Sequence, residues 1–156
     1  MMDFSLSIYT SLIVRLLENS YKFYPFCLYK SINSKKVVIL RHDVDRLHER
    51  ALQMAQLESS LGVNASYYFR IESLINNVLL IKKIENLGHE IGYHYEELDT
   101  VSKKKNLYFS KSFFPYYYLG RRSLKYTPHQ DIIDETYELF KKNLTKFREI
   151  TDIKTI

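Results

Sequence analysis

The chain has 156 residues, of which 46% are hydrophobic and 26% charged, as expected for a globular protein that buries a core. A net charge of +5 is too small to favour nucleic acid as a partner, and four glycines and three prolines exclude a flexible linker. Cys27 is the single cysteine, which excludes an internal disulfide and fits a reducing compartment. No apolar run approaches the ~20 residues of a membrane helix. We therefore expect one cytoplasmic domain without a membrane span.

The apolar pattern predicts strands that alternate with helices. The expected elements, in chain order, are a helix over about 7–20, irregular structure over 21–32, a strand over 37–45, a helix ending near Gly62, a strand over 64–70, a helix ending near Gly88, a strand over 89–95, a helix over 131–150 and the start of a strand over 152–156. The second helix is expected to present one apolar face with Leu47, Ala51, Met54, Leu57 and Leu61. Such alternation is typical of a parallel sheet with right-handed crossovers.

The segment 102–130 interrupts this alternation. It is basic and aromatic, and its length favours a lid or a poorly ordered insertion over an ordinary connection. We interpret its basic residues, among them Arg121, Arg122 and Lys125, as a solvated loop rather than a nucleic-acid surface. Because a fold of this kind continues with further strands, we expect residues 1–156 to form a single but incomplete domain.

Charged side chains stand where the three predicted strands end. They are Asp43 and Asp45, then Arg70 and Glu72, then His94 and Glu96. The carboxyl ends of parallel strands share one edge of a sheet, so we expect these side chains to lie together. Side chains alternate along a strand, which puts Asp43 and Asp45 on the same side. Carboxylate oxygens and imidazole nitrogens are ligands of Zn²⁺ and other first-row divalent metals, so the edge is a candidate metal site.

Each of these residues also has a purely structural interpretation, and the sequence leaves both open. Asp45 precedes a helix and is a possible N-cap. Asp43 has Arg41 and Arg46 close by in sequence, either of which can form an ion pair with it. His94 can be a core histidine whose nitrogens are satisfied by hydrogen bonds.

Two stretches carry a family resemblance: V-V-I-L-R-H-D-V-D over 37–45 and G-H-E-I-G-Y-H-Y-E over 88–96. They resemble the polysaccharide deacetylase (NodB-like) family of carbohydrate esterases, in a divergent branch with an H-D-V-D first motif. The resemblance covers about 37–99, with weaker support from 131–150. It implies an α/β fold that is a partial, distorted (β/α) barrel, with parallel strands and flanking helices.

The resemblance also implies roles for individual residues. Asp43 takes the place of the general base, and Asp45 and His94 take the places of ligands to a divalent metal, for which we expect Zn²⁺. Val44 separates two aspartates that are adjacent in the family, so which of them binds metal stays open. Leu98 stands four residues after His94, where the family has its second metal-binding histidine. The candidates left for a third ligand or a supporting role are Glu96, His42, His89, Arg41 and water.

The activity implied by the resemblance is hydrolysis of an N-acetyl or other acyl group on a sugar or polysaccharide. Tyr93, Tyr95 and the tyrosines at 116–118 could stack on sugar rings, although such aromatics more often pack in a core. The family takes its general-acid histidine from strands that would follow Ile156. The second hypothesis is therefore a truncated or catalytically degenerate member that acts as a non-enzymatic binding module. A partner chain or self-association would then cover the incomplete edge of the barrel.

Overall fold

The computed structural model describes residues 5–105 and 130–156, which divide into two compact units. The first unit contains the residues up to Tyr95 together with Lys146–Ile156, and the second contains the described part of Glu96–Thr145. Most of the predicted insertion, including the tyrosines at 116–118 and the basic residues at 121, 122 and 125, lies outside the described residues.

The first unit has an α/β fold with parallel strands. β2 (Val37–Ile39) and β3 (Arg41–Val44) are consecutive parts of the predicted first strand, separated by Leu40. β3 pairs with β4 (Ser66–Phe69), and β4 pairs with β5 (Glu90–Tyr93), so this sheet has the order β3-β4-β5. The predicted parallel α/β organisation is confirmed. The described strands form two small open sheets and no closed barrel.

One strand was not predicted. β1 (Lys22–Tyr24) pairs in parallel with β2 and forms the second sheet with it. The short 3₁₀ helix η1 (Phe26–Ser31) follows and connects the two strands. The prediction of irregular structure over 21–32 was therefore wrong for these residues. Pro25 ends the strand instead of preventing it, because its missing N–H falls between β1 and η1.

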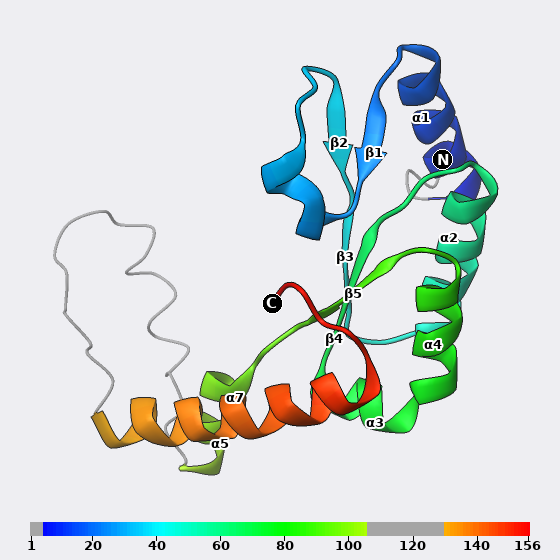
Figure 1. Cartoon of the computed structure of the whole chain (residues 1–156). Helices are drawn as coiled ribbons and strands as arrows, with labels where there is room; N and C mark the ends of the chain where they lie inside the picture. Colours follow the sequence, from blue (N-terminus) through cyan, green and yellow to red (C-terminus); the bar gives the residue numbers. More distant parts are fainter. Residues whose placement is uncertain (1–4, 106–129) are drawn as a thin grey trace, which may run out of the picture. The chain divides into compact units, whose positions relative to one another are not determined.

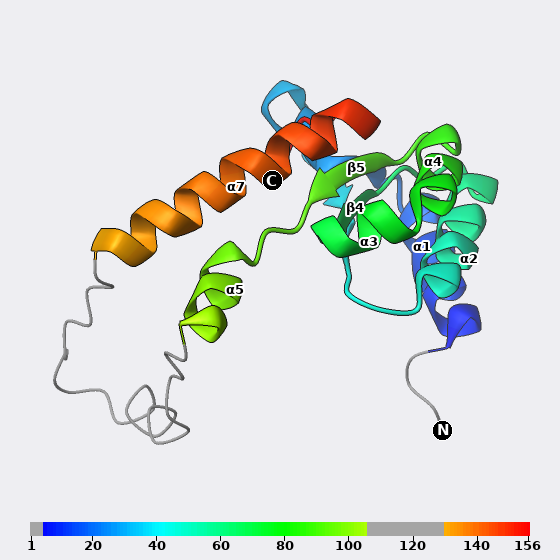
Figure 2. The ribbon, with the colours of Figure 1, turned by 90° about the horizontal axis from the view of Figure 1, so that it is seen from below.

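Helices α1 (Leu6–Glu18), α2 (His48–Ser60) and α4 (Val78–Asn86) lie on the same side of the strands in Figures 1 and 2. α3 (Ile71–Asn76) is separated from α4 by Asn77, so the single helix predicted here is two. None of the described helices is both long and apolar enough to cross a membrane.

The predicted end of α2 is correct, and its predicted apolar face is correct in part, since Ala51 is buried and Met54, Leu57 and Leu61 are partly buried. Gly62 follows the helix with φ +71°, the left-handed conformation that glycine adopts most readily at this position. Leu47 was assigned to the apolar face, yet 63% of its surface is exposed. The residues that α2 buries are Ala51, Leu52, Ala55 and Glu58. Small alanine side chains let the helix approach the sheet closely, and hydrogen bonds compensate for the burial of the carboxylate.

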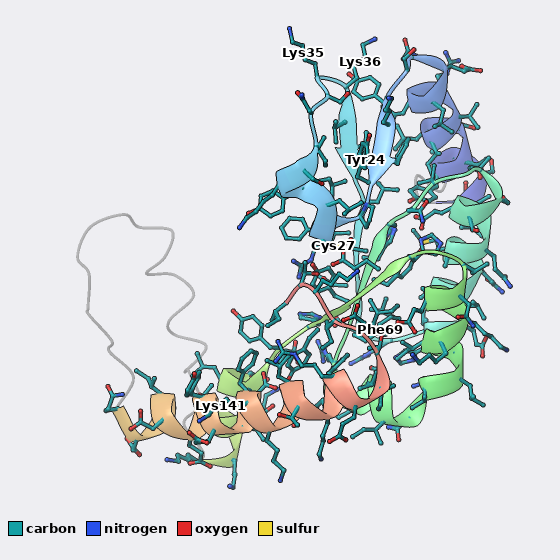
Figure 3. The ribbon with its side chains drawn as sticks, viewed as in Figure 1. Tyr24, Cys27, Lys35, Lys36, Phe69 and Lys141 are labelled. Atoms are coloured by element: carbon teal, nitrogen blue, oxygen red, sulfur yellow. The ribbon has the colours of Figure 1, made fainter. Side chains whose placement is uncertain are left out.

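The core of the first unit is centred on β4, whose four residues are all buried. Phe69, labelled in Figure 3, is fully buried and stacks on His48 of α2, with 6.3 Å between ring centroids. Tyr93 of β5 packs against Phe147, which belongs to the last turns of α7 (Gln130–Ile150), at 4.5 Å between centroids. A strand buried on both faces is typical of the centre of a parallel sheet.

The second unit contains α5 (Glu97–Lys104) and the larger part of α7. α5 was not predicted, and residues 102–104, which we had assigned to the insertion, complete it. The predicted helix over 131–150 is confirmed as α7. Lys105 forms ion pairs of 3.0 Å with Asp131 and Glu135, and Asn143 donates a 2.8 Å hydrogen bond to Glu97. These contacts join α5 to α7 within this unit.

Candidate metal centre

Three polar residues stand at the carboxyl edge of the three-stranded sheet. Asp45, Arg70 and His94 each follow the last residue of their strand, β3, β4 and β5 respectively. The last residues of the three strands are aligned in register, so Asp45, Arg70 and His94 lie side by side just beyond the end of the sheet. We call these three residues the edge site. Their proximity follows from the parallel topology that the sequence predicts.

The edge site is organised around one carboxylate oxygen. Asp45 Oδ1 lies 2.9 Å from Arg70 Nη2 and 3.4 Å from His94 Nδ1. His94 Nδ1 is buried and makes no hydrogen bond within the described residues, because its approach to Asp45 is close enough for an ion pair but not directed as a hydrogen bond. The edge site therefore holds a buried imidazole nitrogen next to a half-exposed carboxylate.

Asp45 does not cap α2. The residue at the N-cap position is Leu47, whose φ of +55° is left-handed and whose side chain makes no capping hydrogen bond. The capping interpretation of Asp45 is therefore wrong, and the carboxylate is used by Arg70 and His94 instead.

Asp43 stands two residues before Asp45, so alternation along the strand puts its side chain on the same face of the sheet, further from the strand end. Its Oδ1 lies 3.0 Å from Nε of Arg41, the ion pair that the sequence left open, and both side chains are nearly half exposed. The Arg41 guanidinium stacks 3.8 Å above the ring of Tyr68, which is aligned with Asp43 in the sheet. Gly92 of β5 is aligned with Tyr68 in turn, so Asp43, Tyr68 and Gly92 form one row across the three strands. A Cβ at Gly92 would lie 2.5 Å from the Tyr68 ring. The glycine thus makes room for the ring.

Two of the residues considered as a third ligand are engaged elsewhere. His42 donates from Nε2 to Glu58 Oε1 at 2.8 Å. His89 is 4% exposed, accepts a hydrogen bond at Nδ1 from the Ala65 N–H and donates from Nε2 to the Ala55 carbonyl. Both nitrogens of His89 are therefore used by the backbone, and His89 has a structural role.

Glu58 is a buried carboxylate that the sequence analysis did not single out. It is fully buried and also accepts hydrogen bonds from the hydroxyls of Tyr67, at 2.6 Å, and Tyr9. Burial acts to raise the pKa of Glu58, but the hydrogen bonds led by that of His42 outweigh it and hold the pKa below its usual value. We call Glu58, His42, His89, Tyr9 and Tyr67 the Glu58 cluster. The signal for it was the spacing of Glu58 from Ala51 and Ala55, which puts all three on one helix face.

Glu96 is the first residue of the second unit and follows His94 by two positions. Two residues of chain span at most about 7 Å, so Glu96 stays near His94 by covalent connection alone. Within the first unit, Asp45 and His94 offer a carboxylate oxygen and an imidazole nitrogen that could hold a metal ion. Asp43 is not part of this pair. Leu98 is a half-exposed residue of α5 and offers no ligand atom.

No protein-family model, curated protein or solved structure matches this chain. The resemblance to polysaccharide deacetylases therefore rests on the two motifs at 37–45 and 88–96. The geometry at the ends of β3 and β5 is an independent observation, since it depends on the fold and not on the resemblance.

Proposed function

We propose that the first unit binds a divalent metal ion through Asp45 and His94 and acts as a hydrolase-like domain that removes N-acetyl or other acyl groups from a sugar or polysaccharide. One observation carries the proposal: a buried imidazole nitrogen without a hydrogen bond in the described chain faces a carboxylate oxygen at 3.4 Å. A buried polar atom of this kind calls for a partner, and a metal ion is one that the donor set suits.

The spacing of the two donor atoms fits a metal. Zinc ligands lie about 2.0–2.2 Å from the ion, so two ligands of a tetrahedral site are about 3.4 Å apart. The separation of Asp45 Oδ1 and His94 Nδ1 is 3.4 Å. His42 and His89 supply no third ligand in this proposal, because both are engaged in the Glu58 cluster. Zinc is the ion we favour, since mixed oxygen and nitrogen ligands suit it.

The chemistry divides between the metal and this chain's own residues. A bound divalent ion supplies a Lewis acid that polarises an acyl carbonyl and acidifies water. Asp43 is the proposed general base, a carboxylate on the face that also carries Asp45 and open enough to solvent to accept a proton from water. Arg41 orients Asp43 through their ion pair and is itself held on the ring of Tyr68.

The proposal includes a partial, distorted (β/α) barrel. Its support is that β3, β4 and β5 are neighbours in sequence order, and that the Tyr93 N–H donates to the Thr155 carbonyl. The segment after α7 thus lies along the free edge of β5, where the next strand of a barrel would run. The same proposal includes a carbohydrate substrate and a partner chain or second copy that covers the open edge of the barrel. It also includes a cytoplasmic location, which the lone Cys27 fits.

A second candidate function is that of a non-enzymatic binding module. Leu98 replaces the second histidine of the family motif, and Arg70 already neutralises Asp45. A domain that retains the fold but lacks a complete set of ligands would bind a sugar without hydrolysing it.

Calorimetric titration of the full chain with Zn²⁺, after treatment with EDTA, tests the proposal. We expect binding with one site per chain, which Asp45→Asn or His94→Gln weakens at least about tenfold, since each removes a ligand. Asp152→Asn is the matched control, because Asp152 is 85% exposed and outside the edge site. Absence of zinc binding by the unchanged chain would refute the metal site.

The activity is tested separately, by acetate release from an N-acetylated chito-oligosaccharide with the zinc-loaded chain. We expect release that Asp43→Asn abolishes while zinc binding is retained. Zinc and sugar binding without any acetate release would favour the binding module.

A further inference from the structure

We infer that Arg70 is a built-in competitor for the cation at the edge site and sets its metal affinity. The inference rests on the proposed metal site and adds its regulation. Arg70 belongs to neither motif of the family resemblance, and it was identified by its position after β4, between the two strand ends that carry the proposed ligands.

The guanidinium binds the atom that a metal would use. Arg70 Nη2 is 2.9 Å from Asp45 Oδ1, the same oxygen that faces His94 Nδ1. An ion pair at this distance occupies the negative charge of the carboxylate when no metal is bound. A metal bound to Asp45 and His94 therefore has to displace the guanidinium or bind beside it.

Both possibilities cost binding free energy. Displacement loses a charge-assisted hydrogen bond, and coexistence puts a divalent ion next to a fixed positive charge. Even with the dielectric constant of water, repulsion between a divalent ion and a guanidinium about 4 Å apart corresponds to more than a tenfold loss of affinity. Arg70 is one-third exposed, so it is screened less than a fully solvated cation.

The opposite role is a positioning one, in which Arg70 holds Asp45 in the rotamer that the metal needs. The two roles differ in the sign of a measurable effect. Removal of a competitor strengthens metal binding, whereas removal of a positioning residue weakens it. The sharing of a single oxygen by Arg70 and His94 favours competition, because a purely positioning contact would leave the ligand atom available.

The test is calorimetric titration of the full chain with Zn²⁺, comparing the unchanged protein with Arg70→Gln. Arg46→Gln is the matched control, since Arg46 is exposed, directly follows Asp45 and loses the same charge without contacting the carboxylate in the described structure. Arg70→Lys retains the charge on a different side chain and covers the case in which Arg70→Gln fails to fold. As a second readout, the melting temperature is measured with and without Zn²⁺.

We expect Arg70→Gln to bind Zn²⁺ at least about tenfold more tightly and to gain more thermal stability from the metal, while Arg46→Gln and Arg70→Lys stay within about threefold of the unchanged chain. Adding Asp45→Asn to Arg70→Gln should cancel the gain. If the unchanged chain binds Zn²⁺ and Arg70→Gln binds it equally or less tightly, the competition is overturned and the metal site stands. If neither protein binds Zn²⁺, the metal site itself fails and the inference fails with it.

Discussion

The two faces of β3 use the same kinds of side chain in opposite ways. His42 and Asp43 are neighbours in sequence, yet His42 bonds to the buried Glu58 while Asp43 pairs with the half-exposed Arg41. In the Glu58 cluster both carboxylate oxygens accept hydrogen bonds. At the edge site, by contrast, a buried nitrogen of His94 makes no hydrogen bond within the described residues.

This difference separates a structural polar group from a candidate functional one. A buried carboxylate whose hydrogen bonds are all made stabilises the fold only as long as every partner is present. A polar atom that keeps bonding capacity at the end of a strand adds little stability and can bind a ligand. The predictions below test whether stability depends on the Glu58 cluster and binding on the edge site.

The largest effect is expected from Glu58→Ala. The substitution leaves the buried hydroxyl of Tyr67, the partly buried hydroxyl of Tyr9 and the Nε2 of His42 without their acceptor. We expect a loss of about 4 kcal/mol in the free energy of unfolding, measured by urea denaturation. Asp45→Ala, at the edge site, should cost less than about 1 kcal/mol because the ion pair between Asp45 and Arg70 is partly exposed to solvent. Similar losses in the two variants would contradict the distinction.

The next effect concerns the row of residues beneath the edge site. In Gly92→Ala the new Cβ would lie 2.5 Å from the buried ring of Tyr68, which must move. We expect a loss of about 2 kcal/mol from this overpacking. Gly62→Ala is the comparison, since its Cβ meets nothing within 4 Å and only its φ of +71° is unfavourable. That change should cost about 1 kcal/mol by the same measurement, and the reverse ranking would argue against a tight contact at Gly92.

A smaller effect is expected from pH. Burial holds the pKa of His89 below its ordinary value of 6.5, so the unfolded chain takes up a proton at a pH where the folded chain does not. This contribution to stability is complete above pH 6.5 and is lost as the pH falls toward the folded-state pKa, by at most about 1.4 kcal/mol per pH unit. Urea denaturation between pH 7.5 and 5.5 should show the loss.

His89→Gln separates this contribution from those of the other groups in the cluster, His42, Glu58, Tyr9 and Tyr67. We expect the variant to lose less stability than the unchanged chain over the same pH range. His48→Gln removes a histidine outside the Glu58 cluster and should leave the dependence in place. An unchanged slope in His89→Gln would show that another group titrates.

The edge site could be predicted from the sequence, because it depends only on where the strands end and on their parallel arrangement. Apolar runs predicted the strands, and the common edge of parallel strands brought Asp45, Arg70 and His94 together. The proposed ligands Asp45 and His94 lie on that edge, while Asp43, the proposed base, lies on the same face with its ion-pair partner. The α/β class was predictable for the same reason.

The Glu58 cluster could not be predicted in this way. Its side chains come from α1, α2 and three further segments. The spacing within α2 puts Glu58 on the face of Ala51 and Ala55, but it does not predict which residues of the other segments Glu58 meets. Charged residues are expected at the surface, so Glu58 was not counted among the buried residues of α2. The short strand β1 was missed because three residues before a proline give too little pattern to favour a strand.

The smallest effect concerns Leu47, which joins the edge site to α2. Its left-handed φ of +55° is costly for a leucine, and its side chain is 63% exposed, so packing does not compensate for the strain. Asparagine tolerates this conformation, and we expect Leu47→Asn to raise the free energy of unfolding by about 0.5–1 kcal/mol. Backbone strain next to a candidate site is often retained for function. Stabilisation together with weaker zinc binding would assign that role to the loop, whereas stabilisation with unchanged binding would restrict the metal site to the strand ends.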